Sequence, residues 1–160
     1  MVKKKDQKSL FLLQNDGTRS YLSPMPKYLK LHATEFNYLF EEIHKCSLED
    51  TETQDYNYYH SLGNNLRKFL ECYLYFKFPS NDDWKSKFNR FFPEEKIEKA
   101  LVFRLVNEFS HTEDQFDRAR NPISIPEMKT AAEYVLQKIA DADEPQYNSL
   151  LQSIGVKPAA

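Results

Sequence analysis

The stretch that decides the fold is YNYYHSLGNNLRKFLECYLYF, residues 56–76. Its large apolar side chains recur at intervals of three and four residues, which is the spacing of one face of an α-helix. The residues on this face are Leu62, Leu66, Phe69, Leu70, Tyr73 and Leu74. A long helix with a continuous apolar face needs other helices to cover it. The stretch therefore predicts the central helix of a mainly α protein.

Helical patterns continue on both sides of this stretch. Proline and polar residues separate them and supply the start and stop signals of helices. The predicted helices are EFNYLFEEIHKC (35–46) capped by Thr34, DDWKSKFNRFF (82–92) capped by Ser80 or Asn81, EEKIEKALVFRLVNEFSH (94–111) with Pro93 at its first position, EMKTAAEYVLQKIADAD (127–143) opened by Pro126, and QYNSLLQSI (146–154) stopped by Gly155. The sequence thus predicts a helical bundle.

The N-terminal region carries a different pattern. In SLFLLQNDGTRSYL, residues 9–22, Asp16-Gly17 separates two apolar stretches, and this is a strong hairpin signal. A lone hairpin is marginal in water, so it needs a packing partner in this chain or outside it. We expect three regions: an arm with the hairpin at 1–26, an α-helical domain at 27–154, and a disordered tail at 155–160.

Composition excludes several classes of protein. The formal net charge is −2, so a nucleic-acid site would have to be local. Two cysteines without CxxC spacing fit free thiols in a reducing cytoplasm, and the four histidines show no pairing typical of a metal site. Apolar runs are too short for a membrane span. With three glycines and neither GxxxxGK nor GxGxxG, the sequence predicts no glycine-rich nucleotide loop, and we expect no cofactor and no metal.

The segment RLVNEFSH, residues 104–111, places Arg104, Asn107, Glu108 and His111 on one face of a helix. The rest of this helix is strongly apolar, so the polar stripe is narrow. Such a stripe fits a cleft or a partner better than bulk water. The alternative is structural: a histidine near a helix C-terminus interacts favourably with the helix dipole.

A second polar group lies in NNLRKFLECYL, residues 64–74, where Arg67 and Glu71 are four positions apart. Side chains at this spacing meet on one helix face. The structural interpretation is a surface ion pair, which would contribute only about 0.3–0.5 kcal/mol to stability. The nearby Asn64 joins Asn107 as a candidate substrate-binding residue.

Cleavage of RNA is the chemistry that would use these residue types. A ribose 2′-hydroxyl must lose a proton and the leaving 5′-oxygen must gain one, and an imidazole serves either step near neutral pH. Arginine can hold the phosphate oxygens as charge builds, and a carboxylate can carry a second proton or orient an arginine. No metal is required for this mechanism.

These residues support a resemblance. Arg104 and His111 are similar to the Arg-x(4–6)-His signature of HEPN-type α-helical ribonucleases. The wider run resembles the C-terminal region of bacterial ABC/SMC-like ATPases of the anticodon-nuclease type, the AAA_13-like ATPases, over roughly residues 20–152. The blocks that carry it are PKYLKLHATEFNYLFEEI, NNLRKFLECYLYFKFP, RLVNEFSH and EYVLQKIADADEPQYNSLLQ.

The resemblance implies a metal-independent endoribonuclease that leaves a 2′,3′-cyclic phosphate. The family's catalytic residues would fall on Arg67, Glu71 and His111, with Arg104 as the arginine of the HEPN-type motif and Asn107 as its companion. It also implies a role in antiviral defence or as a toxin, RNA such as tRNA as substrate, and a homodimer.

The chain departs from that family because it carries no Walker A sequence. We therefore expect it to lack its own ATPase head, with the hairpin as the remnant edge of that head. Two hypotheses follow. The first is a nuclease module with the catalytic residues above. The alternative is a non-catalytic helical module that dimerises or docks on a separate ABC-type ATPase, a reading that the high aromatic content and the near-neutral charge favour.

Overall fold

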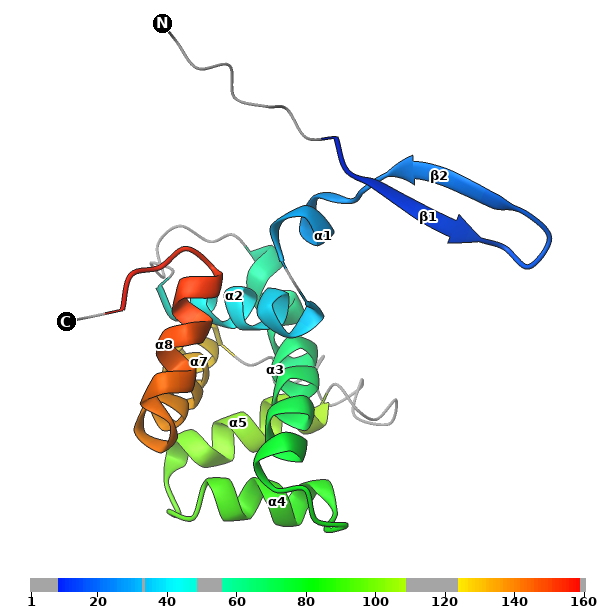
Figure 1. The fold of residues 1–160 in the computed structure, drawn as a ribbon. Helices are drawn as coiled ribbons and strands as arrows, with labels where there is room; N and C mark the ends of the chain where they lie inside the picture. Colours follow the sequence, from blue (N-terminus) through cyan, green and yellow to red (C-terminus); the bar gives the residue numbers. More distant parts are fainter. Residues whose placement is uncertain (1–8, 33, 49–55, 109–123, 159–160) are drawn as a thin grey trace, which may run out of the picture.

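The computed structural model describes residues 9–32, 34–48, 56–108 and 124–158. Within these ranges the chain forms a helical body with a two-stranded antiparallel hairpin that projects from it (Figure 1). The prediction of a mainly α fold with a short N-terminal hairpin is therefore confirmed.

The hairpin consists of β1 (Phe11–Asn15) and β2 (Ser20–Pro24), with Asp16 and Gly17 in the turn, as predicted. Gly17 has a φ of 92°, a left-handed conformation that glycine adopts without steric strain. The second strand continues to Pro24, two residues beyond the predicted stretch. A proline is tolerated there because each strand of a lone hairpin is an edge strand. A five-residue helix that the sequence did not predict, α1 (Lys27–Leu31), follows the hairpin.

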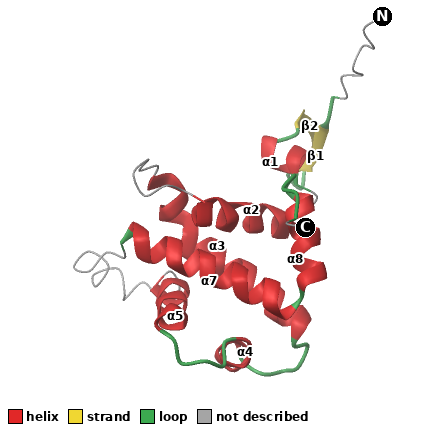
Figure 2. Ribbon diagram, turned by 90° about the vertical axis from the view of Figure 1, so that its left-hand side faces the viewer, coloured by secondary structure: helices red, strands yellow, loops and turns green. Residues whose placement is uncertain are grey.

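The long central helix is α3 (Tyr56–Lys77), and α2 (Glu35–Leu48) packs along it (Figure 2). The six apolar side chains predicted to form the core face of α3 are all buried, from Leu62 to Leu74. At the start of α2 the backbone N–H of Asn37 donates to the Thr34 hydroxyl, which confirms Thr34 as the cap. The core therefore forms along the α2–α3 contact, as the periodicity predicts.

Two short helices cover the next side of α3. They are α4 (Trp84–Phe91) and α5 (Ile97–Glu108). The prediction of the α4 cap was wrong: Asp83 is the N-cap, and its carboxylate accepts from the backbone N–H of Ser86 at 2.7 Å. The predicted start of α5 after Pro93 was also too early, because the helix begins at Ile97.

The C-terminal helices α7 (Ile125–Ala142) and α8 (Glu144–Ser153) complete the body. Ser124 and Glu127 form a capping box at the start of α7, next to Pro126. Gly155 follows α8 with a φ of 79°, and the backbone N–H of Val156 donates to Leu151 O at 2.9 Å. Val156 also packs against the core.

Candidate functional site

The ion pair predicted on α3 is present: Arg67 Nε donates to Glu71 Oε1, and both side chains are partly exposed. On its other side, the guanidinium of Arg67 lies over the indole of Trp84 in α4, 5.1 Å from the ring centroid. Such a contact between a cation and an aromatic face is attractive. Arg67 therefore links α3 to α4 as well as pairing with Glu71.

Asn64 is exposed on α3, three residues before Arg67 and seven before Glu71. These offsets bring the three side chains to one side of the helix. The structure thus groups three of the predicted site residues on the surface of α3, with an amide, a guanidinium and a carboxylate within two helical turns.

Arg104 and Asn107 lie half-buried near the C-terminal end of α5. Arg104 lies toward the start of α7, where its charge helps to hold down the pKa of Glu127. The larger causes of that low pKa are the hydrogen bonds that Glu127 accepts from the backbone N–H and the hydroxyl of Ser124. Arg104 thus faces the capping box of α7, whereas Arg67 faces α4.

His111 lies outside the described residues, since the described part of α5 ends at Glu108 and the next described residue is Ser124. The predicted proximity of the imidazole to the Arg67–Glu71 pair therefore stays a prediction.

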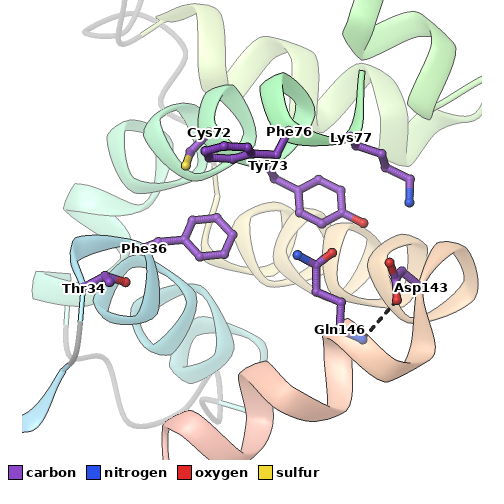
Figure 3. Close-up of a pocket in the computed structure, with 8 residues that line it drawn as sticks. All are labelled: Thr34, Phe36, Cys72, Tyr73, Phe76, Lys77, Asp143 and Gln146. Carbon is purple, nitrogen blue, oxygen red and sulfur yellow. Dashed lines mark hydrogen bonds between the residues drawn. The ribbon is translucent and has the colours of Figure 1, made fainter. Parts of the chain in front are cut away.

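Two hollows lie elsewhere, beside α2 and α3. One has a volume of about 730 Å³ and reaches to α8, and its neighbour, with about 650 Å³, reaches to Glu71. The two share Thr34, Phe36, Cys72 and Phe76. We call the first of them the α8 pocket. Its lining is shown in Figure 3 and comprises Thr34, Phe36, Cys72, Tyr73, Phe76, Lys77, Asp143 and Gln146.

Sequence reasoning missed the α8 pocket, although part of its signal was available. Phe76 continues the aromatic run of YLYFKF and lies three residues after Tyr73, so helical spacing extends the apolar side of the helix to this ring, which the structure leaves exposed. Asp143 and Gln146 come from a distant part of the chain. Only the tertiary packing of the last helices brings them to α3, and spacing along the sequence does not show that.

A smaller hollow of about 240 Å³ lies between α4 and α5 and is rich in lysine. Lys85, Lys96 and Lys99 line it, and Lys99 Nζ is 2.8 Å from Glu95 Oε1. The ammonium of Lys85 lies 6.0 Å from the centroid of the Phe103 ring. Because the net charge of the chain is −2, a nucleic-acid site would have to be a local basic patch, and this hollow is such a patch.

A family model described as AAA domain (AAA_13) matches residues 2–137. The chain belongs to this family. The resemblance to AAA_13-like ATPases is thereby confirmed at the level of the family. Searches of curated proteins and of solved structures found no significant match.

The family match spans both the hairpin and the helical body, including α3, α5 and most of α7. The AAA domain family therefore provides an ATPase-related context for the hairpin and most of the helical body, up to residue 137. No GxxxxGK sequence occurs in the matched residues, so they do not carry the phosphate-binding loop of P-loop ATPases.

In the part of the chain that the structure describes, no group of three or more His, Cys, Asp and Glu side chains is arranged to hold a metal ion. Among the same residues, no helix has the length and apolar character that crossing a bilayer needs.

Proposed function

We propose that this member of the AAA domain family is a docking module whose N-terminal hairpin binds the nucleotide-binding core of a partner ATPase. The observation that carries the proposal is the apolar face of the hairpin. In the antiparallel register Phe11 lies opposite Pro24, and Leu13 lies opposite Leu22, so the four side chains share one face. We call these four residues the hairpin face.

The hairpin face is open to solvent. Phe11, Leu13 and Leu22 are 57, 69 and 68% exposed. Burying a side chain of this size contributes about 1.5–3 kcal/mol, and an exposed apolar cluster typically marks an interaction site. The opposite face is more polar, since a hydrogen bond of 3.0 Å joins Ser23 to Gln14 there. One side of the hairpin is therefore suited to a protein surface.

The partner is inferred from the family. AAA domain proteins are ATPase-related, whereas the matched residues here lack GxxxxGK. A nucleotide-binding core on a separate chain would supply that function. Both strands also have an open edge, which allows pairing with a strand of the partner in addition to burial of the hairpin face.

Co-expression with an ATPase of the AAA domain family that carries a GxxxxGK sequence tests the proposal. We expect the two proteins to co-purify, and we expect Leu13→Ser together with Leu22→Ser to abolish the complex. Gln14→Ala is the matched control on the other face of the hairpin and should leave the complex intact. Retention of the complex by the double variant would contradict docking through the hairpin face.

Sedimentation of the chain alone separates docking from self-association. We expect a monomer–dimer balance that the double variant does not change. A homodimer that dissociates when Leu13 and Leu22 are replaced would instead assign the hairpin face to a second copy of this chain.

An endoribonuclease is the second candidate function, and a specific observation favours it. Arg67 and Glu71 form their pair on the surface of α3, and Arg104 and Asn107 lie at the end of α5 that leads to His111. In this proposal His111 is the general acid or base, the two arginines stabilise the phosphate, and Glu71 carries a second proton or orients an arginine.

Asn64 and Asn107 would contact the RNA, and the lysine-rich hollow between α4 and α5 would add phosphate contacts. Incubation of the purified protein with total tRNA tests this candidate. Products ending in a 2′,3′-cyclic phosphate should form in the presence of EDTA and should be absent with His111→Ala. A cleavage rate that His111→Ala leaves unchanged would exclude the proposed chemistry.

A further inference from the structure

The α8 pocket has the size and lining of a small-molecule site. Its volume of about 730 Å³ lies within the roughly 300–1,000 Å³ of typical ligand pockets. Such sites combine an apolar lining with a few polar groups that fix the orientation of the ligand. Here the apolar groups come from α2 and α3, and the polar groups lie where α3 ends and α8 begins (Figure 3).

Two phenyl rings provide the apolar part. Phe36 stacks on Phe69 of the core with ring centroids 4.5 Å apart and an interplanar angle of 9°, so the core supports one of its faces. Phe76 is 75% exposed and borders the pocket from α3. The open ring of Phe76 offers a stacking surface to a flat aromatic ligand, and the supported ring of Phe36 provides an apolar wall beside it.

The polar part carries an unmet hydrogen-bonding group. Among the residues that the structure describes, none forms a hydrogen bond with the buried hydroxyl of Tyr73, and the residue as a whole is only 2% exposed. In Figure 3 its ring points toward the side of the pocket that holds Lys77, Asp143 and Gln146. Burial and the negative charge of Asp143 raise the pKa of Tyr73 to about 12, so this hydroxyl stays protonated at neutral pH.

The groups around this hydroxyl offer both donors and acceptors. Asp143 accepts from the backbone N–H of Gln146 at 3.0 Å, and a carboxylate has further acceptor sites. The amide of Gln146 both donates and accepts, and its residue is exposed, so the side chain is able to move aside for a ligand. Lys77 lies over the Tyr73 ring, with Nζ 5.6 Å from the centroid, and adds a positive charge.

We propose that the α8 pocket binds a nucleobase, stacked on the open ring of Phe76, bordered by Phe36 and hydrogen-bonded at its edge to Tyr73, Asp143 and Gln146. Proteins recognise unpaired bases in this way, by aromatic stacking combined with hydrogen bonds to the base edge. A base carries donors and acceptors side by side, which matches this set of groups. Lys77 then contacts the phosphate attached to the nucleoside.

Other ligand classes fit less well. A phosphate without a base would meet the carboxylate of Asp143 and would leave the two phenyl rings unused. A lipid chain would cover the rings but leave the Tyr73 hydroxyl without a partner, which is unfavourable. The base has two sources, a free nucleotide or single-stranded RNA, and both present the same chemistry to the pocket.

Binding measurements on the full chain test the proposal. The probes are AMP, GMP, CMP and UMP, six-residue RNA homopolymers of the same bases, and ribose 5-phosphate as the probe without a base. We expect at least one nucleotide or RNA to bind and ribose 5-phosphate not to bind. Equal affinity for a mononucleotide and its hexamer assigns the site to free nucleotides, and tighter binding of the hexamer assigns it to RNA.

Two variants locate the binding. Phe76→Ala removes a largely exposed ring and should weaken binding about tenfold or more, in line with the loss of one stacking contact. Gln146→Ala should weaken it and alter the preference among the four bases. Ile97→Ala, the loss of a similarly exposed apolar side chain at the start of α5, is the matched control and should have no effect.

Three results would overturn the proposal. They are no binding of any nucleotide or RNA at millimolar concentration, equal binding of ribose 5-phosphate, and binding that Phe76→Ala leaves unchanged. N-acetyltryptophanamide provides a further test, since its binding in place of all nucleotides would assign the pocket to a protein side chain. These results concern the helical body alone and do not depend on docking of the hairpin to an ATPase.

Discussion

The guanidinium of Arg67 lies 5.1 Å from the centroid of the Trp84 ring, and its Nε donates to Glu71. One partly exposed side chain of α3 therefore contacts α4 and also forms an ion pair within α3. A residue in this position has a structural role whether or not it also contacts RNA. This relationship decides how variants of the predicted catalytic residues are to be interpreted.

We predict that Arg67→Ala lowers the free energy of unfolding by about 0.8–1.5 kcal/mol. The change removes a cation–π contact of about 0.5–1 kcal/mol and an ion pair of about 0.3–0.5 kcal/mol. Glu71→Gln should lower it by no more than about 0.5 kcal/mol. Urea denaturation measures both. A loss of RNA cleavage in Glu71→Gln without loss of stability would support catalysis, whereas a large destabilisation by Arg67→Ala alone would support the packing role.

The turn of the hairpin should respond to acid. Hydrogen bonds from the Thr18 hydroxyl and from the backbone N–H groups of Arg19 and Thr18 lower the pKa of Asp16 from 3.8 to about 2. Because the folded pKa is the lower one, the stabilisation is present above pH 3.8 and is lost as the pH falls toward 2. NMR titration of the Asp16 carboxyl checks this, and Thr18→Ala should raise the measured pKa. An ordinary pKa in the intact hairpin would contradict the turn geometry.

Phenylalanine positions in the helical body should differ sharply in their effect on stability. Phe69 is fully buried and stacks against Phe36, so Phe69→Ala should destabilise the protein by about 3–5 kcal/mol. Phe76→Ala should change the free energy of unfolding by less than about 0.5 kcal/mol, because that ring is largely exposed. Thermal unfolding followed by circular dichroism measures both variants. A large loss of stability in Phe76→Ala would show that the ring is a packing residue instead of part of a binding surface.

The sequence predicted most of the fold because the core follows helical spacing. Leu62, Leu66 and Phe69 are buried where the three-and-four pattern places them, and Asp16-Gly17 forms the turn that its residue types require. The predicted helix starts that were wrong lie where several neighbouring residues are able to begin or cap a helix. The spacing of apolar residues does not distinguish among them. Asp83 caps α4 in place of Ser80 or Asn81, which carry equally suitable side chains.

The candidate site was less predictable, for a physical reason. The Arg67–Glu71 contact depends only on local helix geometry, so the sequence could indicate it. The contact of Arg67 with Trp84 and the meeting of Tyr73 with Asp143 depend on how separate helices pack. No spacing rule reports such contacts, and the position of His111 relative to them stays a prediction.

The capping box of α7 should contribute measurably to stability. The Ser124 hydroxyl and backbone N–H both contact Glu127 Oε2, at 3.0 and 2.9 Å. We predict that Ser124→Ala lowers the free energy of unfolding by about 1 kcal/mol, a typical value for loss of an N-cap. Chemical denaturation provides the measurement, and Ser149→Ala in α8 serves as a serine control. Equal effects of the two substitutions would argue against a specific role for the cap.

The two cysteines should differ in reactivity with iodoacetamide. Cys46 is buried in the core, whereas Cys72 is partly exposed and lines the α8 pocket, where burial raises the pKa of its thiol. We predict that the native protein is alkylated at Cys72 only, slowly at neutral pH and faster as the pH rises above 9, because the thiolate is the reactive form. Mass spectrometry of the labelled peptides identifies the site. A nucleotide that occupies the pocket should slow this labelling, and Cys46 should react only after unfolding. Equal labelling of both thiols in the native protein would contradict the packing of α2 against α3.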